Sequence, residues 1–104
     1  MTRLQSIERI SAALKTIPEA EVFVFGSSAR GDFKKSSDID LLILLSDSLT
    51  VSQRIEKELE IQGLLWPIEM ESGFDISPII LQHKVWNQRK TPFTINVCND
   101  RIRI

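Results

Sequence analysis

The sequence predicts a small domain of the α/β (α+β) class, in which a mixed sheet is flanked by helices. Residues 3–16 and 51–65 carry apolar residues at the spacing of amphipathic helices. Three apolar runs have the length of strands: residues 21–25, 41–45 and 74–81. The run that follows Asp40 is apolar on both faces, which is typical of a central strand that is covered above and below.

The first helix is predicted to begin at a capping box. Thr2 and Gln5 are three residues apart, the spacing at which each side chain bonds the main-chain N–H of the other. The helix is expected to end before Pro18. Its apolar stripe is expected to cover the sheet and consists of Leu4, Ile7, Ile10, Leu14 and Ile17.

The second helix repeats this signal. Thr50 and Gln53 form another capping box, and residues 51–65 follow it. Gly63 and Pro67 bracket the predicted end of the helix. Its apolar face is predicted to be the line formed by Val51, Ile55 and Leu59.

The last third of the chain contains weaker signals. Pro78 has no N–H, so a strand over residues 74–81 is confined to a sheet edge or a bulge. The Thr-Pro pair at 91–92 predicts a short helix that ends near residue 99. The alternation in residues 101–104 predicts a final edge strand.

The composition indicates one domain, residues 1–104, of ordinary globular type. The net charge is −1 and the basic residues are scattered along the sequence, which argues against a polymerase that binds a nucleic-acid duplex. A single cysteine, Cys98, allows no internal disulfide. Residues 1–10 carry charges where a signal peptide needs an apolar core, and the longest apolar run is far too short to cross a bilayer. We therefore expect a cytoplasmic protein with no membrane association.

Two aspartates stand one residue apart where the central strand begins. In a strand, Asp38 and Asp40 point to the same face, with Cα atoms about 6.5 Å apart. Such a pair can share two divalent cations about 3.5–4 Å apart, the arrangement that serves in-line phosphoryl displacement. Mg²⁺ suits it, because this ion takes one or two carboxylates and leaves positions for substrate phosphates.

A Gly-Ser turn between the first two strands supplies a candidate phosphate site. Gly26 allows close approach of the backbone, and Ser27 can donate from its hydroxyl and its N–H. Arg30 adds further donors for a phosphate, although its spacing equally allows a pair with Asp32. We predict that Gly26, Ser27 and Arg30 bind phosphate groups.

A third acidic residue, Asp75, lies between Phe74 and Ile76 in the last long strand. A carboxylate buried there costs several kcal/mol unless a partner compensates it, and a neighbouring metal pair would be that partner. Glu69 and Glu71 are alternatives, since residues two apart share a face of any strand.

The motifs together resemble a known family. Gly-Ser at 26–27, followed by Asp-Ile-Asp at 38–40 and an apolar run, looks like the signature of the polymerase-beta-type nucleotidyltransferase superfamily. The motifs Gly-Ser-Ser-Ala-Arg-Gly and Ser-Asp-Ile-Asp-Leu-Leu are similar to those of the minimal nucleotidyltransferases, and the resemblance covers nearly the whole chain. It implies a polymerase-beta-like fold and pairing with a partner of the HEPN type in toxin–antitoxin modules. It also implies ATP or another nucleoside triphosphate as substrate, so Gly26, Ser27 and Arg30 are predicted to be nucleotide-binding residues. That family carries its third carboxylate on the strand after the second helix, so Asp75 is predicted to be a metal ligand and the general base.

The predicted function is Mg²⁺-dependent transfer of a nucleoside monophosphate to a hydroxyl acceptor. A chain of 104 residues has no room for a separate acceptor domain, so a protein partner or a second copy is expected to complete the site. A tRNA end and a small molecule stay open as acceptors. Two alternatives stay open as well: an antitoxin-like interaction protein without catalysis, and a nucleotide-binding regulator.

Overall fold

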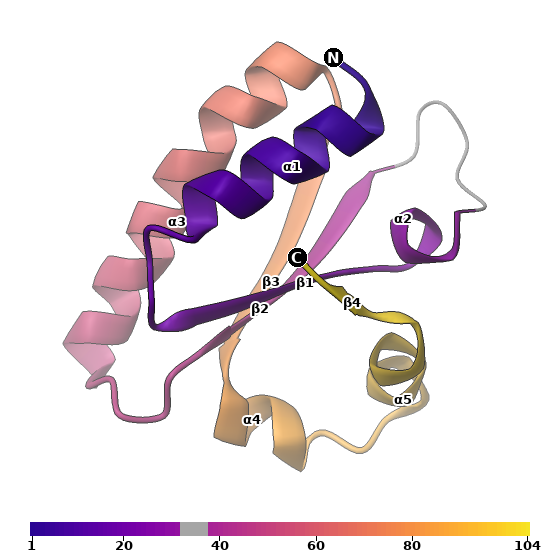
Figure 1. Cartoon of the computed structure of the whole chain (residues 1–104). Helices are drawn as coiled ribbons and strands as arrows, with labels where there is room; N and C mark the ends of the chain where they lie inside the picture. Colours follow the sequence, from indigo (N-terminus) through magenta and orange to yellow (C-terminus); the bar gives the residue numbers. More distant parts are fainter. Residues whose placement is uncertain (32–37) are drawn as a thin grey trace.

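The computed structural model of the chain describes residues 1–31 and 38–104 (Figure 1). The predicted pairing of Arg30 with Asp32 therefore falls outside the described residues. The elements follow one another as α1 (Arg3–Leu14), β1 (Ala20–Phe25), α2 (Ser27–Arg30), β2 (Ile39–Leu45), α3 (Val51–Ser72), β3 (Ile76–Gln82), α4 (His83–Gln88), α5 (Pro92–Asp100) and β4 (Ile102–Arg103).

The strands form one mixed sheet in the order β3-β2-β1-β4. β1 pairs antiparallel with both β2 and β4, whereas β2 and β3 are parallel. The parallel pair is possible because α3 provides the long crossover that such a connection needs. The predicted mixed sheet with flanking helices is confirmed.

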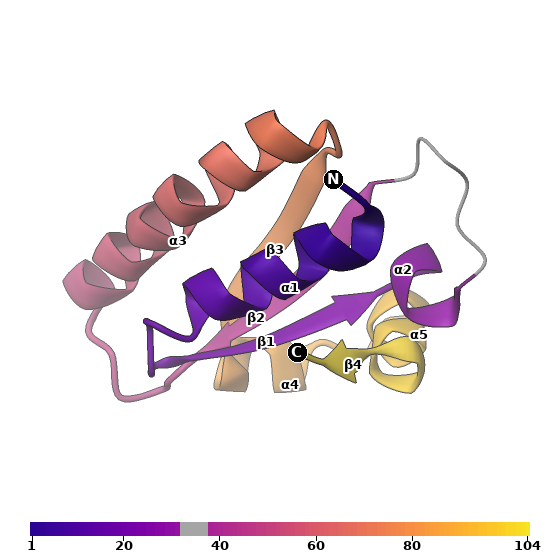
Figure 2. The ribbon, with the colours of Figure 1, turned by 45° about the horizontal axis from the view of Figure 1, so that its top comes forward.

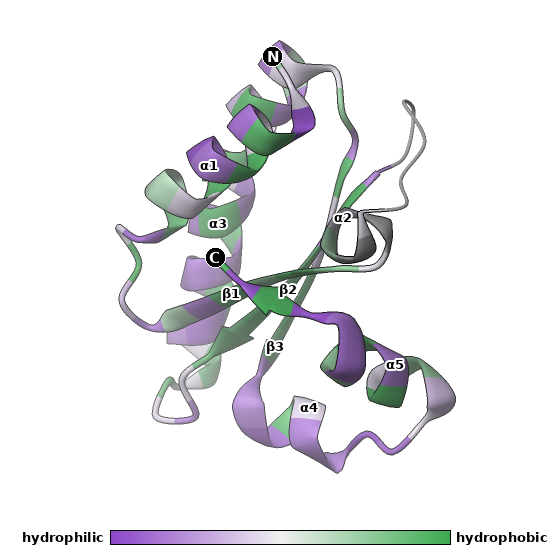
Figure 3. Ribbon diagram, turned by 45° about the vertical axis from the view of Figure 1, so that its right-hand side comes forward, coloured by the Kyte–Doolittle hydropathy of each residue, from purple (hydrophilic) through white to green (hydrophobic). Residues whose placement is uncertain are grey.

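Helices cover the two faces of the sheet in pairs (Figures 1 and 2). On one face, α1 and α3 pack against a cluster of buried side chains that includes Val24, Leu41 and Ile43. On the other face, Trp86 of α4 and Val97 of α5 pack against a second cluster formed by Phe23, Phe25, Leu42 and Leu44. β2 contributes to both clusters, so its prediction as a central strand is confirmed, and the apolar colouring gathers along these strands (Figure 3).

α1 begins at the predicted capping box, in which Thr2 and Gln5 bond each other's main-chain N–H. Its buried apolar residues are Ile10 and Leu14, and Ile17 follows the helix in the same core cluster. The prediction for Leu4 is wrong, because this side chain is exposed at the first turn.

α3 differs from its prediction in length and in rotation. It runs through Pro67 to Ser72 and ends at Gly73, which has the left-handed backbone of a helix C-cap. Ile68, just beyond the proline, is buried against the sheet. We attribute the continuation of the helix to this burial, which offsets the hydrogen bond that proline cannot donate.

The apolar face of α3 was predicted wrongly. Val51, Ile55 and Leu59 are 67%, 48% and 66% exposed, and the helix instead buries its second apolar line. That buried line consists of Ile61, Leu65 and Ile68. The exposed line continues through Trp66 and Met70, so α3 carries an apolar stripe on its outer side, which we call the α3 stripe: Val51, Ile55, Leu59, Trp66 and Met70.

The end of the chain agrees with its prediction in three respects. β3 contains Pro78 and lies at a sheet edge, α5 begins at the Thr91 cap with proline in its first turn, and β4 is an edge strand. The short helix α4 was not predicted. Within the part of the chain that the structure describes, no helix has the length and apolar character needed to span a membrane.

Candidate active site

The paired aspartates lie where β2 begins, next to the end of β1. Asp38 directly precedes the strand, and Asp40 pairs in register with Phe25, the last residue of β1. Asp40 has the same strand parity as Leu42 and Leu44, so it lies on the sheet face that α4 and α5 cover. Asp38 is exposed and Asp40 is half-buried, so the pair lies at the point where the core opens to solvent.

The electrostatics of Asp40 fit a cation. Burial raises the pKa of this carboxyl, and the negative charge of Asp38 raises it further, while the positive charge of Arg3 opposes both. Two carboxylates whose negative charges repel each other are a donor set that a divalent cation stabilises. Asp38 and Asp40 therefore fit the predicted role of metal ligands.

Gly26 lies directly against the Asp40 carboxylate. Its backbone φ is 69°, in the left-handed region, and a Cβ at this position would lie 2.9 Å from Oδ2 of Asp40. Only glycine satisfies both conditions without strain or displacement. The glycine of the Gly-Ser turn thus leaves room for the Asp40 carboxylate as well as for the turn itself.

The remaining predicted nucleotide-binding residues lie in α2. Ser27 and Arg30 are the first and last residues of this single turn of helix, which begins directly after Gly26. The main-chain N–H of Ala29 donates to the carbonyl of Gly26 over 3.1 Å. The side chains of Ser27 and Arg30 are outside what the structure describes, so their contacts with phosphate stay predictions.

Asp75 lies at the same end of the strands as the paired aspartates. It directly precedes β3, and its carbonyl accepts a hydrogen bond from the N–H of Ile39 over 2.9 Å. The parallel register, in which Ile39 is opposite Ile76, places Asp75 level with Asp38. However, Asp75 is exposed, so the expectation that it needs a partner to offset burial is wrong.

Over residues 1–31 and 38–104, no three acidic, histidine or cysteine side chains are grouped closely enough to hold a metal ion. The carboxylates of Asp38 and Asp40 lie close enough to repel each other, whereas the Asp75 carboxylate does not complete a three-ligand set with them. The role of Asp75 as third ligand and general base therefore stays a prediction.

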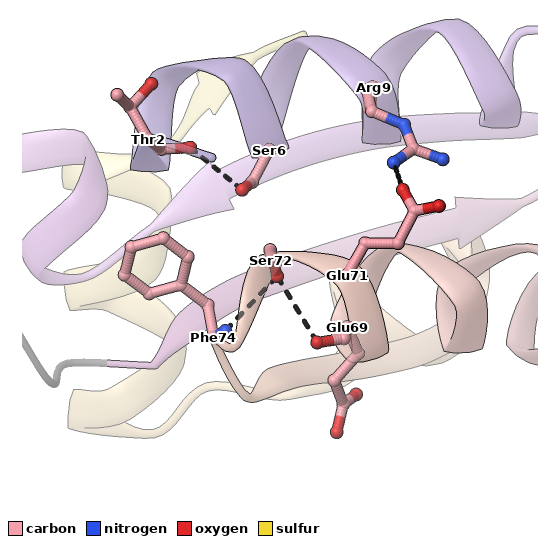
Figure 4. A network of polar contacts seen from close by, with 7 residues as sticks. All are labelled: Thr2, Ser6, Arg9, Glu69, Glu71, Ser72 and Phe74. Carbon is pink, nitrogen blue, oxygen red and sulfur yellow. Dashed lines mark hydrogen bonds and ion pairs between the residues drawn. The ribbon is translucent and has the colours of Figure 1, made fainter.

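The alternative carboxylates, Glu69 and Glu71, do not share a face (Figure 4). Both lie in the last turns of α3, where residues two apart point in different directions. Glu71 forms an ion pair with Arg9 of α1, and Glu69 accepts a hydrogen bond from the N–H of Ile76 over 3.4 Å. The expectation that they form a pair on a strand is wrong, because helix α3 extends to Ser72.

One residue of the site was not predicted. Arg3 lies at the start of α1 and is only 6% exposed. Its Nη1 donates to Ser28 Oγ of α2 over 3.0 Å and to the main-chain carbonyl of Asp38 over 3.1 Å. The sequence contained one signal that could have identified Arg3. It is a basic residue at the start of the helix predicted over residues 3–16, where the helix dipole disfavours positive charge.

A cavity of about 250 Å³ adjoins Asp40 on the α5 side of the sheet. Gly26 and Asp40 contribute to one wall, and Phe93, Asn96 and Asp100 of α5 contribute to the other. Phe93 is 52% exposed and meets Phe25 edge to face, with ring centroids 6.0 Å apart. The sequence predicted helix α5 but not its position over the aspartates.

Comparison with known proteins agrees with this geometry. Residues 7–90 match the nucleotidyltransferase domain family. The chain belongs to this family. The match includes the Gly-Ser turn, both paired aspartates and Asp75, so the resemblance of the sequence to nucleotidyltransferases is confirmed, and with it the predicted nucleotidyltransferase activity of this domain.

Solved structures show the same fold. A protein described as a minimal nucleotidyltransferase superposes with a TM-score of 0.61 at 23% identity, over 100% of this chain and 97% of that chain. A nucleotidyltransferase from Sulfolobus solfataricus gives 0.57 at 22% identity, over 96% and 77%. A toxin–antitoxin structure with AMP-PNP gives 0.58 at 20% identity, over 98% and 72%. No curated protein matches this chain in sequence.

Proposed function

We propose that this nucleotidyltransferase domain transfers AMP from ATP to a hydroxyl group on a partner protein, in the manner of an antitoxin. The observation that carries the proposal is the close contact of Asp40, the partner of Asp38 in the carboxylate pair, with Gly26 beside an open cavity. This arrangement combines paired carboxylates with a close backbone turn, which are the two needs of a bound Mg²⁺–triphosphate.

The residues of the site divide the work. Asp38 and Asp40, joined by Asp75, would hold two Mg²⁺ ions, which when bound neutralise phosphate charge and lower the pKa of the acceptor hydroxyl. Gly26, Ser27 and Arg30 bind the β- and γ-phosphates. The exposure of Asp75 supports its role, since a general base must be within reach of an acceptor that arrives from solvent.

The reaction is an in-line displacement at the α-phosphorus. The acceptor oxygen forms a bond to this phosphorus while the bond to the oxygen that bridges to the β-phosphate breaks. The hydroxyl proton passes to the carboxylate of Asp75, and pyrophosphate leaves with the electron pair of the broken bond. The protein contributes orientation and charge rather than covalent chemistry.

The cavity under α5 is the proposed place of the nucleoside. It begins at Asp40, where the α-phosphate is held, and Phe93 presents a half-exposed ring beside it. An aromatic ring stabilises a nucleobase by about 1–3 kcal/mol when the two stack. Phe93→Ala is expected to weaken Mg²⁺-dependent binding of AMP-PNP, measured by calorimetry, and Phe93→Tyr is the matched control that keeps the ring.

The α3 stripe supports a protein partner. Its large apolar side chains are about half or more exposed, and such aligned apolar surface marks protein–protein contacts. A structural neighbour is a toxin–antitoxin complex with AMP-PNP, which favours a toxin partner here too, and we propose the HEPN type. A second copy of this chain is the other partner that the stripe allows.

The same stripe favours a second candidate function, in which the domain inhibits its partner by covering it and transfers nothing. An AMP-transfer assay separates the two. The protein that co-purifies with this chain is incubated with it, ATP and Mg²⁺, and then weighed by mass spectrometry. Transfer predicts a gain of one or more AMP units, which the Asp38→Asn, Asp40→Asn double variant abolishes.

An unmodified partner that both the parent and the double variant still inhibit supports steric inhibition instead. Mg²⁺-dependent ATP binding without pyrophosphate release, in the presence of every partner tried, supports a regulator that binds nucleotide without turning it over. Both results contradict the proposed transfer.

A further inference from the structure

Arg3 occupies a position that local preferences disfavour. It is the first residue of α1, where the helix dipole favours negative charge, and the first turn contains no acidic residue that would offset it. It is also almost fully buried, which is rare for arginine unless its charge is paired. Departures from local rules of this kind concentrate at functional sites, and the contacts of Arg3 lie at the candidate site.

The guanidinium group joins the segments that build the site. Nη1 donates to Ser28 Oγ in α2 and to the carbonyl of Asp38 before β2, over 3.0 and 3.1 Å. The guanidinium carbon lies 4.7 Å from the ring centroid of Phe74, the residue that precedes Asp75. Helix α2, the paired aspartates and the turn before β3 thus share one contact residue.

We propose that Arg3 is a positioning residue of the active site, which holds Asp38 and Ser28 so that the carboxylates of β2 and the turn of α2 face a common space. This inference rests on the proposed binding of Mg²⁺ and ATP. Groups that hydrogen-bond around metal ligands typically change metal affinity or activity 10–100-fold when they are altered. The planar guanidinium holds two acceptors from one nitrogen while it lies over the Phe74 ring, and lysine keeps the charge but lacks this plane and its fixed donor directions.

The test uses Arg3→Lys, which keeps the charge and removes the planar guanidinium. The matched control is Arg9→Lys on the same helix, where the arginine pairs with Glu71 at the surface. In the protein without ligand, hydrogen exchange of the Ile39 and Ala29 amides reports the positions of the β2 start and of α2. Calorimetry with AMP-PNP and increasing Mg²⁺ then gives the metal dependence of nucleotide binding.

Arg3→Lys is expected to lose protection at both amides and to need about 10–100-fold more Mg²⁺ for half-maximal nucleotide binding, while Arg9→Lys matches the parent in both measurements. If Arg3→Lys does not fold, Ser28→Ala decides the question, because it keeps the arginine and removes one acceptor. We expect a loss in the same direction from Ser28→Ala, smaller in size.

Binding in Arg3→Lys that equals the parent's overturns the positioning role and leaves the proposed function intact. Where Arg3→Lys cannot be used, the same result in Ser28→Ala overturns it. A parent that binds no Mg²⁺–nucleotide overturns the proposed function itself, and the role of Arg3 with it. Lost amide protection with unchanged Mg²⁺ dependence shows that Arg3 supports the fold alone, and this also contradicts the proposal.

Discussion

Replacing Gly26 with alanine separates backbone strain from damage to the site. The new methyl group requires a backbone φ of 69° and would lie 2.9 Å from Oδ2 of Asp40. The atom it meets is the end of a flexible side chain, which can move at little cost in stability. However, that atom belongs to a predicted metal ligand, so the displacement is expected to damage binding and transfer.

Both effects have a size that follows from the structure. An alanine in the left-handed region costs about 1–2 kcal/mol, which lowers the melting temperature of a domain this small by about 5–15 °C. Ordinary van der Waals contact begins at 3.4 Å, so Oδ2 must move by 3.4 − 2.9 Å, or about 0.5 Å. Since a misplacement of about 1 Å can cost about 100-fold in rate, we expect Gly26→Ala to lose about tenfold in transfer.

Gly31→Ala is the matched control. Gly31 has a φ of 76°, but, among the residues that the structure describes and apart from its chain neighbours, no atom lies within 4 Å of where a Cβ would be. Both variants should therefore show similar losses in melting temperature, whereas only Gly26→Ala should show weaker Mg²⁺-dependent AMP-PNP binding and slower AMP transfer. Equal losses of binding and transfer in the two variants would refute the role assigned to the contact with Asp40.

The remaining predictions concern the carboxylates and α3. Because burial and then Asp38 raise the pKa of Asp40, its proton stabilises the fold fully below the ordinary carboxyl pKa, and this stability is lost as pH rises through the raised folded-state pKa. Asp40→Asn should therefore have a higher melting temperature than the parent at neutral pH without divalent cations. This difference in melting temperature should shrink towards acid pH in thermal scans, and a constant difference contradicts the reasoning. Asp75→Asn should lower AMP transfer by about 100-fold or more as the loss of a general base, whereas Glu71→Gln should leave transfer unchanged, and the reverse order would reassign the base. Leu65→Ala, in the core, should cost about 2–5 kcal/mol in denaturant unfolding, but Leu59→Ser, on the α3 stripe, should cost little and instead weaken co-purification with the partner; a partner that stays bound contradicts the use of this stripe.

Local patterns carried the prediction of the paired aspartates and the glycine turn. The alternation of a strand places Asp38 and Asp40 on one side wherever the strand packs, and a Gly-Ser turn between two strands is readable without knowledge of the fold. These expectations depend on residues that are close in sequence, so tertiary packing has little effect on them. The parallel pairing of β2 with β3, which brings Asp75 level with Asp38, was available only through the resemblance to a family.

Two errors have the same origin. α3 contains two apolar lines at helical spacing, and periodicity does not tell which line faces the sheet; Ile61 and Leu65 do, whereas Ile55 and Leu59 do not. Pro67 was read as a helix end because its local effect is unfavourable, but burial of the following residue outweighs it. In both cases the deciding free energy comes from the sheet, which lies far away in sequence.

The sequence by itself determined the class of the fold, the carboxylate pair and the turn beside it, because each depends on spacing along a few residues. Only the tertiary structure decided that Arg3 contacts Ser28 and Asp38, that α5 lines a cavity at Asp40, and that the α3 stripe is exposed. The first two features join residues about 25 to 60 positions apart, and all three depend on strand register and helix rotation, which local propensities do not encode.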